Sequence, residues 1–314
     1  MRSALIAISL TLLIQVSAAA QSAALPPSLV KLSGYLQARE VYQSKAGLTS
    51  SINRARLAAS GSIVEAVTWR IQTEFRTGSV GTGRASVSLQ DAYVRYAPAG
   101  WALQIGQFKT PFTREYMTSI AEIETADRST ATDSLAPKRD IGLMAEYTYR
   151  QVTVWAGVFN GECQNVTANT DSTVLGVGRV AVLVVPGLSF AVNSARYFGD
   201  STRYGVDAAY EDERITLNGE YLSQHRDGAP GPDDWGWYGL GAVNLSPRIQ
   251  VVGKYEEFAR PAVGAAVKNQ AWTTGLNLYP QGRNFRLTFD YLSRKIGEPG
   301  VRKGRLLGQA QVRF

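Results

Sequence analysis

The sequence predicts an all-β fold, a 16-stranded antiparallel transmembrane β-barrel with an inward-folded third outer loop, on three observations. Residues 31–314 contain short segments in which apolar and polar residues alternate with period two, which places the two sets on opposite faces of a strand. The connections between these segments alternate between short and long. After Ala20 no segment is apolar throughout, so the apolar residues are spread over many strands.

The N-terminal 20 residues have the composition of a secretory signal peptide. Arg2 supplies the positive start, residues 4–16 an apolar core, and residues 18–20 a small-residue cleavage site. A membrane anchor is the alternative, but the apolar run is short for a spanning helix. We therefore expect an exported chain with a signal peptide at 1–20, a short periplasmic lead-in at 21–30, and a single transmembrane barrel at 31–314.

Sixteen alternating segments make up the predicted barrel. Most of them approach the roughly 9–11 residues that cross a bilayer as a tilted strand. They span residues 31–42, 51–62, 64–77, 87–97, 101–107, 141–149, 152–160, 174–185, 188–198, 202–210, 215–224, 235–245, 249–258, 269–279, 285–295 and 305–314.

The connections follow a regular phase along the chain. Every second connection is tight: around Ile63 and at 98–100, 150–151, 186–187, 211–214, 246–248 and 280–283. The others are mostly longer, including the first one and those at 161–173, 225–234, 259–268 and 296–304, while 199–201 is a short exception. Barrels of the bacterial outer membrane have short periplasmic turns and longer outer loops, and a soluble sandwich has no reason to keep this phase. The pattern therefore predicts a bacterial outer-membrane barrel, multi-pass, with both chain ends in the periplasm.

Closure of the barrel decides which face meets lipid. A closed barrel satisfies every backbone donor and acceptor within the membrane, so the apolar face points outward and the polar face lines a wet lumen. The predicted lumen residues are Arg39, Arg54, Arg56, Arg70, Glu74, Arg76, Arg95, Lys254, Glu256, Arg286, Asp290 and Arg294. The predicted aromatic girdles contain Trp69, Trp101, Trp235, Trp237, Tyr279, Tyr291 and Phe314.

The connection at 108–140 is too long for a simple loop. Long loops without regular structure are usually functional, and a 16-stranded barrel is wide enough for an aqueous channel. A loop folded inside the barrel would constrict this channel, whereas one lying over the mouth would not. We expect the inward fold, with a short helix over 119–128.

The net charge and the cysteine content limit the kinds of binding partner and site that we expect. The formal net charge is +7, which suits anionic partners. Nucleic acid is not expected, because the chain is exported and its arginines fall singly on polar strand faces. Cys163 is the only cysteine, which excludes an intrachain disulfide and a multi-thiolate metal site. We expect no metal and no cofactor.

Several short motifs occur in the order known from one family. They are Leu-Gln-Asp-Ala-Tyr-Val-Arg-Tyr at 89–96, Ile-Gly-Gln-Phe-Lys-Thr-Pro-Phe at 105–112, and the segments 128–129, 139–142, 157–161 and 275–279. Together they resemble the porin O and P family, the phosphate-selective porins, over nearly the whole mature chain. The resemblance implies a 16-stranded, typically trimeric outer-membrane barrel that passes anions. Phe314 resembles the terminal signal that the barrel-assembly machinery reads.

The channel hypothesis assigns roles to individual residues. Guanidinium groups match phosphate oxygens and keep their charge, and rings of Arg or Lys favour anions if binding stays weak. The candidate anion-pathway residues are Arg39, Arg54, Arg56, Arg70 and Arg95 on the wall and Lys109, Arg114, Arg128 and Arg139 in the long loop. Asp91 and Asp140 are expected to orient nearby arginines.

The solute and the partners remain partly open at this point. The chain has few lysines and its outer loops contain Asp and Glu, so general or weakly anion-selective diffusion stands beside true phosphate selectivity. The expected partners are small anions such as phosphate, outer-membrane lipid and lipopolysaccharide, the assembly machinery, and two further copies in a homotrimer.

Two other functions remain open. An outer-membrane barrel hydrolase would use His225 with Asp227 and Ser223, since such enzymes commonly need a histidine beside a carboxylate or serine. A non-conducting structural barrel is the second. The sequence favours a channel, because His225 is the only histidine.

Overall fold

The computed structural model describes residues 30–76, 85–169, 172–228, 232–262, 265–297, 300 and 302–314. The predicted signal peptide at 1–20 and the lead-in up to residue 29 lie outside the described residues. In the part of the chain that is described, no helix has the length and apolar character needed to cross a membrane.

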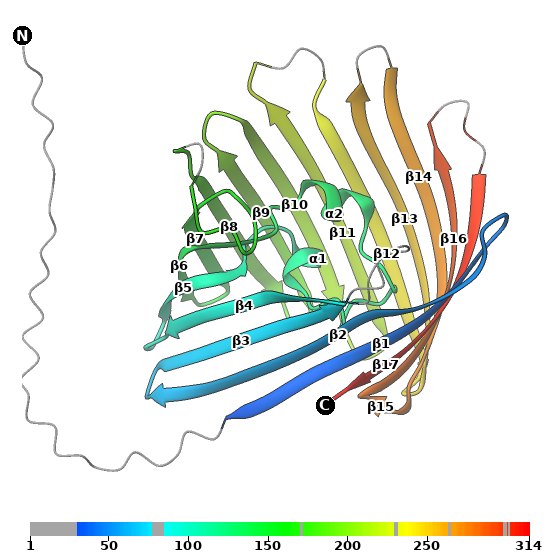
Figure 1. Ribbon diagram of the computed structural model, residues 1–314, viewed down its shortest axis with the longest axis horizontal. Helices are drawn as coiled ribbons and strands as arrows, with labels where there is room; N and C mark the ends of the chain where they lie inside the picture. Colours follow the sequence, from blue (N-terminus) through cyan, green and yellow to red (C-terminus); the bar gives the residue numbers. More distant parts are fainter. Residues whose placement is uncertain are drawn as a thin grey trace, which may run out of the picture.

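Sixteen antiparallel strands form a closed barrel, which confirms the predicted 16-stranded antiparallel β-barrel (Figure 1). Closure occurs at β1 (Lys31–Gln43), which pairs with β2 (Gly47–Val64) on one side and with β17 (Arg302–Arg313) on the other. The remaining barrel strands, in chain order, are β3 (Val67–Arg76), β4 (Ser86–Tyr96), β5 (Trp101–Lys109), β6 (Arg139–Tyr149), β7 (Val152–Phe159), β8 (Leu175–Val185), β9 (Leu188–Tyr197), β10 (Ser201–Glu211), β11 (Ile215–Arg226), β12 (Asp234–Ser246), β13 (Ile249–Ala262), β14 (Ala265–Leu278) and β16 (Phe285–Ile296).

The last residue of the chain takes part in closure. The Phe314 N–H donates to the Gly34 carbonyl at 3.1 Å, and the Gly34 N–H donates to the Phe314 carbonyl at 2.9 Å. A Cβ on Gly34 would lie 2.7 Å from the Phe314 ring and 2.5 Å from the Arg56 carbonyl oxygen. Glycine is therefore required where the first and last strands meet.

The two ends of the barrel differ in their connections. One end, called here the short-turn end, has tight turns at 65–66, 97–100, 150–151, 186–187, 212–214 and 247–248, and the short strand β15 (Pro280–Arg283) before β16. The other end, called the long-loop end, carries residues 110–138, 160–169 and 172–174. Two predictions are wrong there: the first connection is only 44–46, and β13 and β14 continue well into 259–268. Lys45 and Gly47 have positive φ values of 74° and 77°, which allow the tight turn.

Burial confirms that the polar face points inward and the apolar face outward. Gln37 and Glu74 are 0% exposed, whereas Leu36 and Val192 are 44% and 55% exposed. Tyr279 was predicted in the outer girdle, and this is wrong: it is buried, and its hydroxyl donates to Gln250 Oε1 at 3.3 Å. Period two puts residue 279 on the same face as the buried Asn277.

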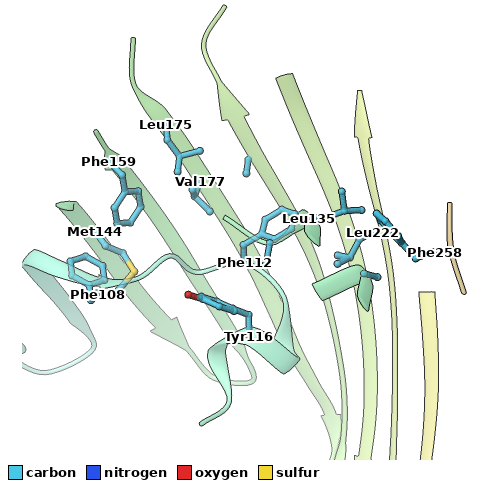
Figure 2. Packing of buried hydrophobic residues seen from close by; sticks show 13 residues of the cluster. Phe108, Phe112, Tyr116, Leu135, Met144, Phe159, Leu175, Val177, Leu222 and Phe258 are labelled. Atoms are coloured by element: carbon cyan, nitrogen blue, oxygen red, sulfur yellow. The ribbon is translucent and has the colours of Figure 1, made fainter. Parts of the chain in front are cut away.

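One part of the interior is apolar, which the alternation did not predict. Figure 2 shows Phe112, Tyr116 and Leu135 from the 110–138 segment packed against side chains of the barrel wall. The wall side chains of this cluster come from strands β5 to β8 and from β9, β11 and β13: Phe108, Met144, Phe159, Leu175, Val177, Ala195, Leu222 and Phe258. Burial of this cluster fixes one edge of the 110–138 segment to the wall.

The 110–138 segment has two short helices, α1 (Arg114–Met117) and α2 (Thr130–Leu135). The predicted helix at 119–128 is wrong. Its backbone carbonyls instead accept hydrogen bonds from wall side chains: Ala121 from Gln311, Ile123 from Arg286 and Glu124 from Asn277. A helix would use these carbonyls for its own i→i+4 bonds.

Candidate functional site

The segment 110–138, called here the long loop, is bound to β9, β10 and β11 near α1. Arg114 donates from Nε to Asp207 Oδ1 at 3.0 Å and from Nη2 to Ser189 Oγ at 2.9 Å. The backbone N–H of Glu115 donates to Glu220 Oε1 at 2.5 Å. Arg114, a predicted anion ligand, is thus an anchor of the long loop.

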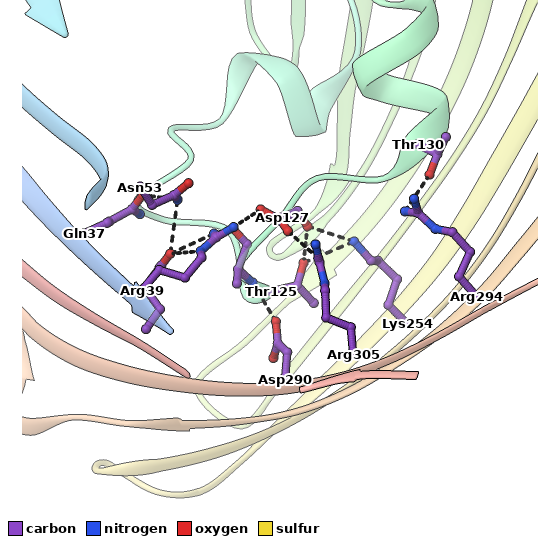
Figure 3. A network of polar contacts seen from close by, with 12 residues as sticks. Gln37, Arg39, Asn53, Thr125, Asp127, Thr130, Lys254, Asp290, Arg294 and Arg305 are labelled. Carbon is purple, nitrogen blue, oxygen red and sulfur yellow. Dashed lines mark hydrogen bonds and ion pairs between the residues drawn. The ribbon is translucent and has the colours of Figure 1, made fainter. Parts of the chain in front are cut away.

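The opposite edge of the long loop is bound to strands near the closure of the barrel (Figure 3). Asp127 forms ion pairs with Arg39 at 2.9 Å and with Arg305 at 2.8 Å. Lys254 donates to the Asp127 carbonyl at 3.0 Å, and the Ala126 N–H donates to Asp290 at 2.8 Å. Burial acts to raise the pKa of Asp127, but the two guanidinium groups outweigh it and lower the pKa.

The two halves of the long loop are joined by a central set of hydrogen bonds. The Glu115 carboxylate accepts from the Ser129 N–H at 2.9 Å and from Ser129 Oγ at 2.8 Å. Ser129 is also the N-cap of α2, since its Oγ accepts from the Thr132 N–H. Arg128 donates to the carbonyls of Glu115 and Thr118, both at 2.9 Å. Arg128 therefore stabilises the long loop from within.

Cavities border the long loop. One of 580 Å³ is lined by Glu122, Glu211, Arg283 and Arg313, which lie toward the short-turn end. Another of 370 Å³ is lined by Asp133, Lys254, Arg294 and Arg305. Both cavities carry charged side chains of both signs.

The arginines on β2, β3 and β4 line the wall close to closure, and most of them are paired. Arg56 donates to Glu74 at 2.5 Å, and Arg95 donates to Glu146 at 3.0 Å. Asp91 accepts from Arg139 at 2.8 Å and lies 3.8 Å from Arg70. Asp91 therefore contacts two of the candidate arginines.

Arg54 differs from the other candidate residues. It lies on β2 beside a bulge between Gln37 and Ala38, and it is partly buried. Its Nε is inaccessible to solvent and has no hydrogen-bond partner. Within the described residues its guanidinium forms no hydrogen bond or ion pair, although Arg56 and Arg128 are close enough to act on it electrostatically.

Two predicted roles are replaced by other contacts. Lys109 Nζ donates to the Met117 carbonyl at 3.0 Å and to the Thr118 carbonyl at 2.9 Å. Lys109 therefore stabilises the start of the long loop. The expectation that Asp140 orients an arginine is wrong. Its carboxylate accepts from the backbone N–H groups of Ile141 and Gly161, because these amides lie next to it at the strand end.

The cluster around His225 does not assemble as the hydrolase alternative requires. His225 Nδ1 lies 2.9 Å from Asp233, and both side chains are exposed. The Asp227 carboxylate is instead paired with Arg196 at 2.5 Å. Among the described residues, no group of three or more His, Cys, Asp or Glu side chains could hold a metal ion.

Several functional contacts were not predicted. Asn277, Asp290 and Gln311 hold the long loop in place through hydrogen bonds. Each occupies an inward position of its strand, and the parity of the alternation was the only signal available.

Known structures share this barrel. OmpT of Vibrio cholerae superimposes with a TM-score of 0.66 at 12% identity, over 91% of this chain and 97% of that chain. The outer membrane channel DcaP of Acinetobacter baumannii gives 0.68 at 14% identity, over 91% and 97%. An anion-selective porin from Comamonas acidovorans gives 0.68 at 14% identity, over 91% and 100%. At these identities the likeness concerns the fold.

Sequence comparison identifies the family. No curated protein sequence matches the chain. The family model of phosphate-selective porin O and P matches residues 33–218, more than half of the chain. A closed barrel of sixteen strands, a lumen lined with arginines and this match agree. The chain therefore belongs to the phosphate-selective porin O and P family, and its fold is that of an outer-membrane porin.

Proposed function

We propose that this porin gives passive diffusion to small anionic and polar solutes, and that the inward-folded long loop forms its constriction. The support is the set of contacts that hold the loop to inward-facing side chains on both sides of the lumen. Arg114 and Glu115 bind β9 to β11, while Asp127 binds β1 and β17. In this proposal the free path runs past the arginines of β2 to β4, a part of the wall to which these contacts do not bind the loop.

The main support for the proposed anion preference is that the guanidinium of Arg54 is unpaired within the described residues. Its neighbour Arg56 is neutralised by Glu74, but Arg54 has no ion-pair partner within the described residues. A guanidinium keeps its charge and offers forked N–H donors, so a passing anion is attracted to Arg54. One such contact binds weakly enough to let the ion leave.

The test is the reversal potential in planar bilayers under a salt gradient. For Arg54→Gln we expect the anion/cation permeability ratio to fall about threefold, because one unpaired fixed charge is lost. Arg150→Gln, at an exposed short turn, removes the same charge and should leave the ratio unchanged. An unchanged ratio in Arg54→Gln would contradict the assignment, and a wild-type barrel without conductance would contradict the channel itself.

Arg54→Gln is preferred to a change at Arg56. Removing Arg56 would leave the fully buried Glu74 with Arg76 as its ion-pair partner in the described chain, which disturbs folding as well as selectivity. The double variant Arg54→Gln with Arg56→Gln should lower anion preference further. It is informative only if the single variant already has an effect.

Phosphate is, in this proposal, one permeating anion among others. Seven of the nine candidate cations are engaged with carboxylates or carbonyls of the loop and wall, and Arg70 lies at a longer ion-pair distance. Such a lumen favours weak anion selectivity over a phosphate or polyphosphate site. We expect millimolar phosphate to leave the chloride current unblocked in single-channel recordings, and block at that concentration would establish specific binding.

We further infer a homotrimer assembled in the bacterial outer membrane after removal of the signal peptide. OmpT of Vibrio cholerae is described in a trimer form. The secretory composition of residues 1–20 and the terminal Phe314 support export and recognition by the assembly machinery. Light scattering of the purified protein tests the trimer, and N-terminal sequencing of the mature chain tests cleavage after residue 20.

A further inference from the structure

A row of polar side chains crosses the outer surface of the barrel near its long-loop end. Direct strand pairing places Trp237 beside Glu257, Glu257 beside Gln270, Gln270 beside Lys295, and Lys295 beside Arg302. These residues belong to β12, β13, β14, β16 and β17, which are consecutive in the barrel (Figure 1). The outer polar row is defined here as Glu257, Gln270, Lys295 and Arg302 together with Lys268, which is paired with Glu257, while Trp237 borders the row. The row interrupts a surface on which many large apolar side chains are exposed.

The outward direction of the row follows from its neighbours. Lys254 and Glu256 on β13 bond to Thr125 and Thr130 of the long loop, so both point inward. Glu257 and Tyr255, which alternate with them, point outward. Ala271 is buried beside Gln270, and residues paired directly across strands share a face.

Glu257 holds the polar side chains of the row in a fixed arrangement. Its Oε1 accepts from the Tyr255 hydroxyl at 2.6 Å and from Gln270 Nε2 at 2.7 Å, and its Oε2 lies 3.1 Å from Lys268 Nζ. The ammonium of Lys268 also lies over the Trp235 ring. Lys268 is thus positioned by two neighbours while part of its side chain stays accessible.

An aromatic cluster begins beside Glu257 and extends toward the short-turn end. The rings of Trp237 and Tyr255 are 5.3 Å apart, and those of Tyr255 and Trp272 are 4.3 Å apart. Outward Trp and Tyr side chains mark the level at which lipid headgroups meet the acyl chains. The outer polar row therefore lies at the level of the headgroups.

We propose that the outer polar row is a binding surface for a phosphorylated lipid headgroup of the surrounding leaflet. Lys268 and the exposed Arg302 supply the cations, and Arg302 is near enough to Tyr255 to act on it electrostatically. Gln270 supplies an amide donor between them, and the Trp237–Tyr255–Trp272 cluster supplies the apolar surface for the acyl chains. The surface does not depend on conduction through the lumen.

Native mass spectrometry of the detergent-solubilised porin tests the proposal. The probes are diphosphorylated lipid A and its fully dephosphorylated counterpart. We expect wild-type protein to prefer the phosphorylated probe about tenfold, and Lys268→Gln with Arg302→Gln to lose this preference. The matched control Arg150→Gln with Arg214→Gln removes two exposed charges at the short-turn end and should keep it.

The outcomes are distinguishable. A preference that is equal in the double variant and in wild type overturns the proposal. So does a double variant that falls apart into monomers with its lipid preference intact, since the row would then be an interface between copies of the chain. Unchanged single-channel conductance and unchanged heat-dependent mobility of the variant on gels show that the channel and the fold are intact.

Discussion

A single residue, Asp127, joins the long loop to two strands on either side of the barrel closure. Arg39 comes from β1 and Arg305 from β17, and both guanidinium groups lie within 3 Å of the carboxylate. Because its pKa is lowered from 3.8, the stabilisation by the charged form is complete above pH 3.8. It is lost as the pH falls through the lowered pKa.

Acidification should therefore release this edge of the loop. We expect the open-channel noise of wild type to be constant between pH 7 and pH 5 and to rise below pH 3.8. Asp127→Asn should be noisy at every pH, since a pair this exposed contributes about 1 kcal/mol. Asp133→Asn is the control, because no hydrogen bond or ion pair of its side chain occurs in the described residues. A quiet Asp127→Asn channel at pH 7 would contradict the anchoring role.

At the scale of elements, the long loop is a short helical hairpin closed by Glu115. The carboxylate caps α2 through Ser129, a residue 14 positions further along the chain. The backbone N–H of Glu115 donates to the Glu220 carboxylate on β11. Glu115 thus couples the shape of the loop to its attachment on β11.

Removing this carboxylate should loosen α2 without unfolding the barrel. For Glu115→Ala we expect the Ser129 and Thr132 amides to exchange hydrogen about tenfold faster, as loss of a cap costs about 1 kcal/mol or more. Amides in β14 and β16 should exchange as in wild type. Equal protection of Ser129 in both proteins would show that the cap does not hold the helix.

The sequence predicted the strands and their faces well, and the partners of the inward side chains less well, for physical reasons. Period two records directly which face of a strand meets lipid, so segments such as 69–76 could be assigned. The partner of an inward charge depends instead on register: the bulge beside Arg54 is invisible in the pattern, yet Arg56 is paired and Arg54 is not. The same limit applies to α2, whose capping carboxylate comes from α1.

At the scale of the whole molecule, the last residue of the chain extends the β1–β17 pairing that closes the barrel. Phe314 pairs with Gly34 through two backbone hydrogen bonds, and its ring is 67% exposed on the outer surface. The backbone pairing serves closure, and we propose that the exposed ring serves recognition during assembly.

The substitution Phe314→Ala tests the ring separately from the backbone pairing. Because the backbone pairing is retained, we expect refolding of the purified variant into vesicles to match wild type. Assembly in cells should fall severalfold if the ring is the signal that the machinery reads. Folding yields are measured by the heat-dependent mobility of the barrel on gels. A loss of folding in vesicles would instead assign the ring a structural role.

The two edges of the long loop should differ in how strongly dissolved salt weakens them. Ions screen the partly exposed Asp127–Arg305 pair, since the Debye length falls to about 3 Å at 1 M. The apolar contacts of Phe112 and Leu135 are not weakened by screening. Concentrated electrolyte should therefore weaken the Asp127 edge more than the apolar edge, although the hydrogen bond from Asn277 to the Glu124 carbonyl is kept. We therefore expect the conductance to rise faster than the conductivity of the bath up to 3 M potassium chloride.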